Sequence, residues 1–389
     1  MRFFMKLKVF SVLFISLLNL SAFEFGYMGN ESFGMGGSGV AVSKSAWGLY
    51  YNPAMQGVDN NFKIGYSFGI RIKENRISDL SNINLSNISS VDLLNDILTN
   101  NGLSMTSENG IALQVPLILT ENISSSIGVG VFYTKRSVIN FTGNINAGTT
   151  NIDNVNNAYI VTNRLDILEI PVSYTMQIYS GFGTFYLGGN LKYIYSGHSA
   201  DKNKLDSGVA VMDSFKDIFK SGSGVKTNTF GVDVGLAYAA PMEYIVIGIV
   251  AKNLNNPKLK TIDLGESQNL KLDSQYRIGI STRIIPLTTI ALDADLKPNY
   301  EFSGFNTNIS RNKVQYVSLG AMVNAGVVDI RFGFAKDILK NNNEGWLISG
   351  GLGFGFIDLS VFSDTKLIKV NNSKIPSEFG VKLGGSFSF

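Results

Sequence analysis

The sequence predicts a transmembrane antiparallel β-barrel, an all-β fold of fourteen strands with an N-terminal luminal hatch. Three observations predict it: an apolar leader, strands of alternating polarity, and connections that alternate between long and short. Hydrophobic residues make up 44% of the chain, aromatic residues 11% and charged residues only 16%, and there are 41 glycines. This composition is typical of short amphipathic strands bordered by aromatic girdles.

The leader, residues 1–22, reads as a secretory signal peptide. Arg2, Lys6 and Lys8 give it a positive start, and residues 9–20 form an apolar run. That run is too short to span a bilayer as a helix, which favours a cleaved signal over an anchor. A short buried helix is the alternative interpretation. The three leader charges account for the formal net charge of +3, so the composition gives no reason to expect a nucleic-acid partner.

The chain after the leader divides into a hatch, residues 23–60, and a barrel, residues 61–389. No later stretch is apolar for long enough to form a membrane-spanning helix. Instead, the alternation of polar and apolar residues predicts fourteen strands. They lie near residues 61–73, 109–119, 123–135, 158–178, 183–196, 226–239, 243–253, 274–285, 287–297, 313–324, 326–336, 345–355, 356–366 and 378–389.

The last strand shows the alternation clearly. Phe379, Val381 and Leu383 point to one face, whereas Gly380 and Lys382 point to the other. Strand side chains alternate with a period of two, so this pattern places lipid on one side and water on the other. To leave no open edge in lipid, this strand must pair with the first one, residues 61–73.

The connections predict which end of the barrel faces out of the cell. Residues 74–108, 136–157, 197–225, 254–273 and 298–312 are long, and the connections between them are short. Outer-membrane barrels have long extracellular loops and short periplasmic turns, in strict alternation. We therefore expect the outer membrane of a Gram-negative bacterium, an even strand number, and both chain termini on the periplasmic side.

Two of the long loops carry helical spacing. Leu94 and Leu98 belong to one apolar stripe, and Val211, Met212, Phe215 and Phe219 belong to another. Such stripes indicate amphipathic helices. These helices either cap the barrel and pack on their own loops, or form an apolar platform that gathers a hydrophobic ligand.

The hatch region is rich in glycine. Gly34, Gly36, Gly37 and Gly39 fit the letters of a dinucleotide-binding motif, but no strand precedes them. That motif needs a strand before it and a helix after it, so a nucleotide site is not predicted. Glycines also let a backbone pack tightly against a wall, which favours a compact plug within the lumen.

The order of these motifs resembles two related families. Gly34–Gly37 followed by Tyr51, Asn52, Pro53 and Ala54 resembles the N-terminal hatch of FadL-type outer-membrane transporters of hydrophobic compounds. Gly231–Leu236, Val250–Pro257, Leu272–Gly279, Ala291–Leu296 and Gly350–Leu359 look like the related conjugal transfer TraF-like proteins. The resemblance spans nearly the whole chain after the leader.

The resemblance implies a fourteen-strand barrel with a hatch and passive, porin-like transport of a small, possibly hydrophobic, molecule. The alternative is a structural or accessory role in a conjugation or secretion system, or an adhesin. Expected partners are outer-membrane lipid, the barrel-insertion machinery, a small hydrophobic ligand and, for the alternative, an unknown secretion-system component. The plasmid-encoded TraF is thioredoxin-like, but a chain with no cysteine has no thiol chemistry.

Charged residues fall on the predicted inner faces of the strands. Both signs occur, so these residues either pin the hatch and stabilise the interior or line a polar conduit. A charged lumen argues against transferring a fatty-acid substrate to this chain, because fatty acids favour apolar pockets. The set comprises Asp233, Lys252, Arg277, Asp293, Asp295, Asp329, Arg331, Asp358 and Lys382.

An enzyme is not predicted. His198 is the only histidine in the chain, and we expect it in a solvated loop, where Asp201 could pair with it for acid–base chemistry. No set of histidines and carboxylates has the spacing of a metal site. We therefore expect no catalytic residue, no metal and no cofactor.

Overall fold

The computed structural model of the chain describes residues 22–23, 25–43, 45–75, 101–120, 123–142, 159–204, 216–222, 224–263, 266–302, 313–339, 345–370 and 373–389. Residues 1–21 of the predicted signal peptide lie outside this set. So do Leu94, Leu98, Val211, Met212 and Phe215, five of the six residues of the predicted loop platform.

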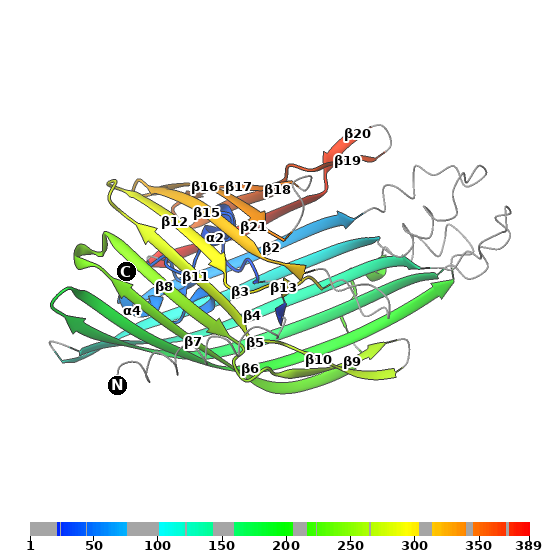
Figure 1. The fold of residues 1–389 in the computed structure, drawn as a ribbon, viewed down its shortest axis with the longest axis horizontal. Coiled ribbons are helices and arrows are strands. Elements are labelled where there is room, and N and C mark those ends of the chain that lie inside the picture. The colour runs from blue at the N-terminus through cyan, green and yellow to red at the C-terminus, as the bar shows by residue number, and fades with distance from the viewer. Residues whose placement is uncertain are drawn as a thin grey trace, which may run out of the picture.

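Fourteen antiparallel strands close into a barrel (Figure 1), which confirms the predicted fold. Each strand pairs with the next barrel strand along the chain, and β21 returns to pair with β2. The strands are β2 (Lys63–Asn75), β3 (Gly102–Thr120), β4 (Ile123–Thr142), β5 (Tyr159–Ser180), β6 (Gly183–Lys204), β7 (Val225–Ala239), β8 (Ile245–Lys252), β11 (Gln275–Thr282), β12 (Thr288–Asp295), β15 (Tyr316–Asn324), β16 (Val328–Asp337), β17 (Leu347–Phe354), β18 (Ile357–Asp364) and β21 (Glu378–Ser388).

The barrel wall is tall on one side and low on the other. Strands β3 to β6 have 19 to 22 residues, whereas β8, β11, β12, β17 and β18 have 8 each. The tall strands therefore extend beyond the low ones at the end that carries the long loops (Figure 1). We call this the long-loop end and the opposite one the short-turn end.

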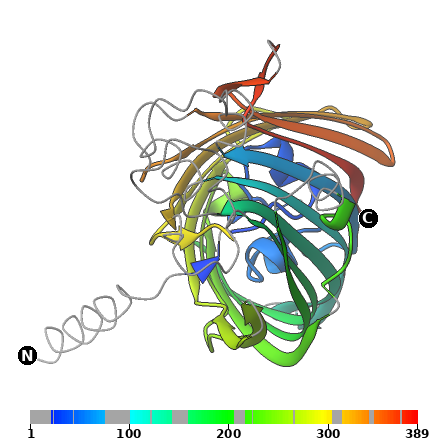
Figure 2. The same cartoon turned by 90° about the vertical axis from the view of Figure 1, so that its right-hand side faces the viewer.

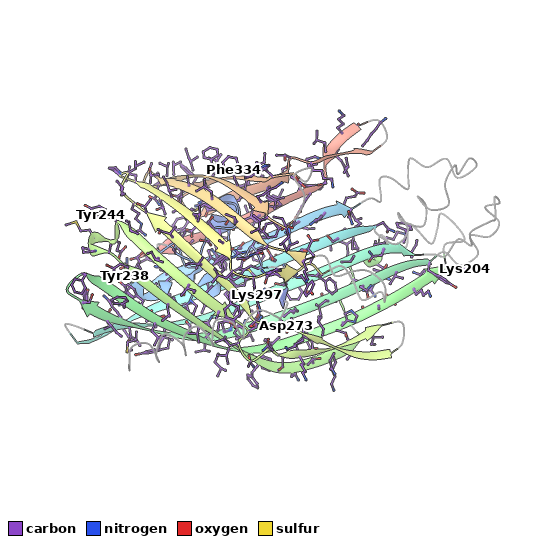
Figure 3. The ribbon with its side chains drawn as sticks, viewed as in Figure 1. Lys204, Tyr238, Tyr244, Asp273, Lys297 and Phe334 are labelled. Carbon is purple, nitrogen blue, oxygen red and sulfur yellow. The ribbon has the colours of Figure 1, made fainter. Side chains whose placement is uncertain are left out.

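The alternation of side chains agrees with the sequence. On β21, Leu383 is 49% exposed on the outer face, whereas Lys382 beside it is 1% exposed in the lumen. Aromatic side chains such as Tyr238 and Tyr244 lie near the short-turn end (Figure 3), where membrane proteins concentrate them at the interface. Among the described residues, no helix is both long enough and apolar enough to cross a membrane.

Residues 25–43 and 45–60 lie inside the barrel. We call these residues the luminal segment; it contains the helices α2 (Asn30–Gly34), α3 (Gly48–Tyr51) and α4 (Met55–Val58), which Figure 2 shows within the ring of strands. Before it, β1 (Ala22–Phe23) pairs in parallel with β13 (Asn299–Tyr300), and β13 pairs with β14 (Lys313–Val314).

The position of β1 corrects one expectation. Strand β13 follows the long-loop end of β12, so β1 lies at that end, whereas Phe389 donates its backbone N–H to Phe62 at the short-turn end. The prediction that both ends of the chain lie on the same side is wrong for the described residues. The luminal segment therefore descends through the lumen from the long-loop end before it joins β2.

Two hairpins at the long-loop end were not predicted. The first, β9 (Lys258–Asp263) and β10 (Glu266–Lys271), packs Leu259 and Leu270 against Leu165 and Ile194 of the tall wall. The second consists of β19 (Leu367–Val370) and β20 (Ser373–Pro376) and forms a separate sheet between β18 and β21. A short 3₁₀ helix, η2 (Pro241–Glu243), forms the turn between β7 and β8.

Candidate functional site

The luminal segment has an aromatic core. The rings of Phe25 and Tyr51 stack with their centroids 5.9 Å apart, and Tyr50 meets Phe132 of β4 edge to face at 5.2 Å. Trp47 is 1% exposed in the same cluster. Large aromatic side chains bury the most apolar area per residue, so this cluster fills the lumen where the segment meets the tall wall.

The first half of the segment is bound to the low wall. One carboxylate oxygen of Asp293, on β12, accepts the backbone N–H groups of both Gly39 and Val40, at 2.8 and 3.0 Å. On β17, Ser349 accepts the N–H of Gly36 at 2.8 Å and donates to the carbonyl of Gly34 at 2.9 Å. Hydrogen bonds to a charged group are the stronger kind, so Asp293 is the strongest of these clamps.

Serine hydroxyls on the low wall continue these clamps. Ser281 donates to the carbonyl of Ala41, Ser360 donates to the carbonyl of Asn30, and the hydroxyls of Ser38 and Ser318 lie 3.0 Å apart. Ser281, Ser318 and Ser360 stand on the inner face of the wall, on β11, β15 and β18. They bind the segment without any strand pairing to it.

The second half of the segment is bound to the tall wall. On β5, Thr175 donates to the carbonyl of Pro53 at 2.6 Å, and Gln56 bonds to Ser173 at 2.7 Å. On β6, Asn190 donates to the carbonyl of Leu49 at 2.9 Å. The two halves of the segment are thus held mainly by opposite walls of the barrel.

Asn52 joins the two halves. It is completely buried, and its side-chain amide donates to the carbonyls of Val40 at 3.1 Å and Leu236 at 3.2 Å. Its side-chain oxygen accepts the N–H of Ala54. One residue therefore ties the first half, the second half and β7 together.

Glycines make room for the segment. Gly36, at φ +70°, lies against the backbone of β16, and a methyl group on Gly333 would collide with the backbone of Met35 and Gly36. On the tall wall, a methyl group on Gly188 would collide with the backbone between Pro53 and Ala54. A backbone can approach another this closely only where a Cβ is absent.

The predicted hatch residues all lie in this interior. Gly34, Gly36 and Gly39 make the backbone contacts described above, and Gly37, at φ +91°, lies beneath the ring of Tyr27. Tyr51, Asn52, Pro53 and Ala54 form the part held by the tall wall.

The predicted inner charges also face the lumen. Arg277 pairs with Asp295 at 2.7 Å, and Arg331 lies 3.2 Å from Asp358 and 3.1 Å from Asp329 near the short-turn end. Eight of the nine residues are buried and Asp329 is partly buried. The remaining four are Asp233, Lys252, Asp293 and Lys382.

The sequence did not predict the contacts that hold two of the buried lysines, Lys192 and Lys252. Lys192 lies 2.8 Å from Glu169 and 3.1 Å from Asp233. Lys252 lies over the rings of Tyr50 at 3.6 Å and Phe25 at 4.6 Å. A cation over an aromatic face gains electrostatic attraction, so Lys252 stabilises the aromatic core of the segment.

Sequence reasoning missed Glu108. Its carboxylate accepts the backbone N–H of Tyr27 and lies 3.7 Å from the ammonium of Lys382. The predicted strand began at residue 109, which left Glu108 in a loop. The inward alternation does continue through Thr106 and Glu108, but it is obscured by Met105, which lies on the other face and is also buried.

A further network closes the short-turn end. Lys63 donates to the carbonyl of Ser43 at 2.7 Å, and Arg283 donates to the Ser43 hydroxyl. Arg283 also lies 3.0 Å from Glu243 in the η2 turn. Burial raises the pKa of Glu243, against the opposing effect of Arg283.

The expectation for His198 is wrong. His198 is completely buried within β6, not solvated in a loop, and its Nδ1 accepts the N–H of Ile262 in the β9–β10 hairpin. Asp201 is bonded to Arg164 instead. The strand runs on to Lys204, its tip in Figure 3, because β6 pairs with β5 along its entire length.

A protein-family model described as "F plasmid transfer operon, TraF, protein" matches residues 49–295, more than half of the chain. The chain belongs to this family. A search of curated proteins gives no match to the TraF-family chain.

Solved structures share the fold of this TraF-family barrel. The toluene transporter TbuX of Ralstonia pickettii aligns with a TM-score of 0.56 at 13% identity, over 94% of this chain and 99% of TbuX. The monoaromatic hydrocarbon channel CymD gives 0.55 at 18% identity over 95% and 99%. The toluene transporter TodX of Pseudomonas putida gives 0.53 at 13% identity over 94% and 99%. At these identities the likeness shows a shared fold alone.

We predict that Gly188→Ala loosens the second half of the segment. Its new methyl group collides with the backbone at Pro53 and Ala54, so the segment must shift, at a cost of about 1–3 kcal/mol. Thermal unfolding in detergent measures it. Gly189→Ala is the matched control, since its methyl group meets only the carbonyl of Asp233 at 3.7 Å. Equal unfolding temperatures for the two variants would contradict the close contact between Gly188 and the luminal segment.

We also predict that Asp293→Ala releases the first half. It leaves the buried N–H groups of Gly39 and Val40 without their charged acceptor, a loss of about 3 kcal/mol or more. Ion leak through the reconstituted barrel should rise. The same substitution in a chain lacking residues 27–54 should add nothing; a further increase there would show that Asp293 acts on the wall itself.

Proposed function

We propose that this TraF-family barrel carries a small, possibly hydrophobic, molecule passively across the outer membrane, with the luminal segment as a movable hatch. Loop residues at the long-loop end collect the ligand, the barrel shields it, and displacement of the hatch opens a path. The solved structures with the same fold are described as transporters and channels of toluene and monoaromatic hydrocarbons, which supports a ligand of this kind.

The observation that carries the proposal is the way in which the luminal segment is held. Its helices α2, α3 and α4 belong to none of the ladders that build the wall. The segment is fixed by separate side-chain contacts, such as those of Asp293, Ser349 and Thr175. Contacts of this kind can break in groups while the barrel stays closed, which is what a hatch requires.

A seam in the tall wall supports passage of an apolar ligand. Between β2 and β3, paired residues resume only at Ile70 and Ser107 after Ser67 and Gly110. In the interval, the side-chain oxygen of Asn109 accepts the N–H of Gly69, and the hydroxyl of Ser107 donates to the carbonyl of Gly69. Side chains thus replace ladder bonds here, so this part of the wall is easier to disturb in lipid than a stretch with a continuous ladder.

A second seam lies two strands further along the wall, so that the pair β3–β4 has a seam on each side. Between β4 and β5, pairing passes from Val129–Val172 to Phe132–Glu169 without the residues between them. Pro171 lies in this interval and has no N–H to donate. The strands β3 and β4 are therefore bordered by weakened ladders on both sides.

The loop platform is supported by the described part of its second stripe. Phe219 is 66% exposed at the long-loop end, whereas Ile218 before it is buried against Met105 and Ile160. One residue thus anchors the loop to the barrel mouth while its neighbour presents an aromatic ring to solvent. This arrangement suits the capture of an apolar molecule.

The hatch is tested by deleting residues 27–54. We expect small-molecule and ion leak through reconstituted barrels to rise at least tenfold, because the deletion removes both halves of the segment and their contacts with the walls. Planar-bilayer conductance and vesicle swelling measure the effect. Unchanged conductance of a correctly folded barrel that lacks residues 27–54 would contradict the proposal.

A second candidate function is an accessory role in a conjugation or secretion assembly. The family description, which names a plasmid transfer operon, supports it. The raised wall of β3 to β6 would then be the working surface. Purification from outer membranes separates the two candidates: a stoichiometric protein partner supports the assembly role, whereas a co-purifying apolar ligand supports transport.

A further inference from the structure

The short turns of the barrel carry large apolar side chains at their tips (Figure 1). At every short turn whose residues the structure describes, at least one such side chain is strongly exposed, from 67% at Val327 to 82% at Met242. An exposed apolar surface of this kind marks a contact with a partner or with a membrane. We call it the apolar rim, and its residues are Phe182, Met242, Ile284, Leu287, Val327 and Phe356.

The conformation of the turns does not account for the rim. Met242 and Leu287 have φ values of +59° and +60°, a left-handed backbone that favours glycine or asparagine. The long-loop end follows this preference, because Asn253 and Asn256, at φ +54° and +49°, hold the left-handed positions after β8. At two positions the short-turn end therefore keeps large apolar side chains where small polar ones are favoured.

Tyrosine side chains bond to backbone carbonyl groups at the tips of two turns. The hydroxyl of Tyr238 donates to the carbonyl of Phe182 at 2.7 Å. The hydroxyl of Tyr66 donates to the carbonyl of Phe356 at 2.6 Å. A carbonyl group in lipid must be bonded by the protein, since no water is there to do it. These two turns meet that requirement.

Neighbouring turns also bond to one another. Gly355 donates its backbone N–H to the carbonyl of Val327 at 2.9 Å, and Arg283 donates its backbone N–H to the carbonyl of Tyr244 at 3.0 Å. The guanidinium of Arg283 lies 3.0 Å from the carboxylate of Glu243, so the two charges of these turns are paired. The turns thus continue the paired backbone of the wall.

The low wall needs its turns to span a bilayer. Strands β8, β11, β12, β17 and β18 have 8 residues each, whereas a membrane-spanning strand has about 9–11. On β11, the exposed outward side chains of Ile278 and Ile280 lead to Ile284 and Leu287 in the following turn. The lipid-facing surface is therefore continuous with the rim.

We infer that the apolar rim is immersed in the periplasmic leaflet of the membrane, where its side chains contact phospholipid at the boundary between headgroups and acyl chains. Apolar side chains and tyrosine favour this boundary. The inference rests on the membrane placement in the proposed function, but not on transport. The short-turn mouth of the barrel then lies at the level of lipid and not in periplasmic water.

The test uses single cysteines, since the chain has none of its own. Phe182→Cys and Phe356→Cys each carry the polarity-sensitive dye NBD in vesicles of phosphatidylethanolamine and phosphatidylglycerol. We expect blue-shifted emission, and quenching by a phospholipid with a nitroxide on its acyl chain near the headgroup. The control is Lys260→Cys, exposed on β9 at the long-loop end, whose dye should emit as in water and be quenched by iodide instead.

A second variant separates lipid contact from folding. Asparagine suits the left-handed backbone at both positions, so Met242→Asn/Leu287→Asn should fold as the original barrel does, which circular dichroism checks. Nitroxide quenching of a dye at Ile284→Cys should fall in this background, because two amides replace apolar side chains beside it. Unchanged quenching would overturn the inference for these turns.

Two further results would overturn the inference. Quenching of the Phe182→Cys and Phe356→Cys dyes by iodide in vesicles would show that the rim faces water, which leaves it to a periplasmic protein. A blue shift that appears only as the ratio of protein to lipid rises would make the occupant a second copy of the chain. Neither result bears on leak through the barrel, so failure here is distinguishable from failure of the proposed transport.

Discussion

The structure depends on the requirement that every backbone hydrogen-bonding group be paired where the chain meets hydrocarbon. The ladder between β2 and β21 meets this requirement by closing the sheet. Closure uses the backbone of the wall almost completely, so the wall can hold something in its lumen only through inward side chains, at every second position. Asp293, Ser349 and Thr175 are such side chains.

This constraint explains the character of the interior. A barrel of this size encloses a lumen that its own wall residues do not fill, and the luminal segment occupies it with an aromatic core and many separate clamps. At Gly333 and Gly188 the backbone of the wall lies against the backbone of the luminal segment, and these wall residues have no Cβ atom. Binding by scattered side chains, with no ladder, is the physical basis for treating the segment as a hatch.

Much of the wall could be predicted from the sequence, because lipid outside and water inside impose a strict period of two. The ranges from 61–73 to 378–389 all correspond to strands. The pattern fails where both faces of a strand are buried, as at Met105 and Thr106, so Glu108 was missed. Inward residues such as Asp293 could be predicted, but their partners could not. The alternation of side chains along a strand does not reveal which backbone groups of the luminal segment lie beside them. The path of β1 and the β19–β20 hairpin depend on long-range contacts that carry no local signal.

The central claim is that the luminal segment must leave its seat for a molecule to pass. The hydroxyls of Ser38 and Ser318 lie 3.0 Å apart across the boundary between segment and wall, and the chain has no cysteine of its own. Ser38→Cys/Ser318→Cys therefore allows one disulfide to lock the hatch. Uptake of a monoaromatic hydrocarbon into vesicles should stop when the pair is oxidised and return on reduction. Equal uptake in the two states would contradict the account.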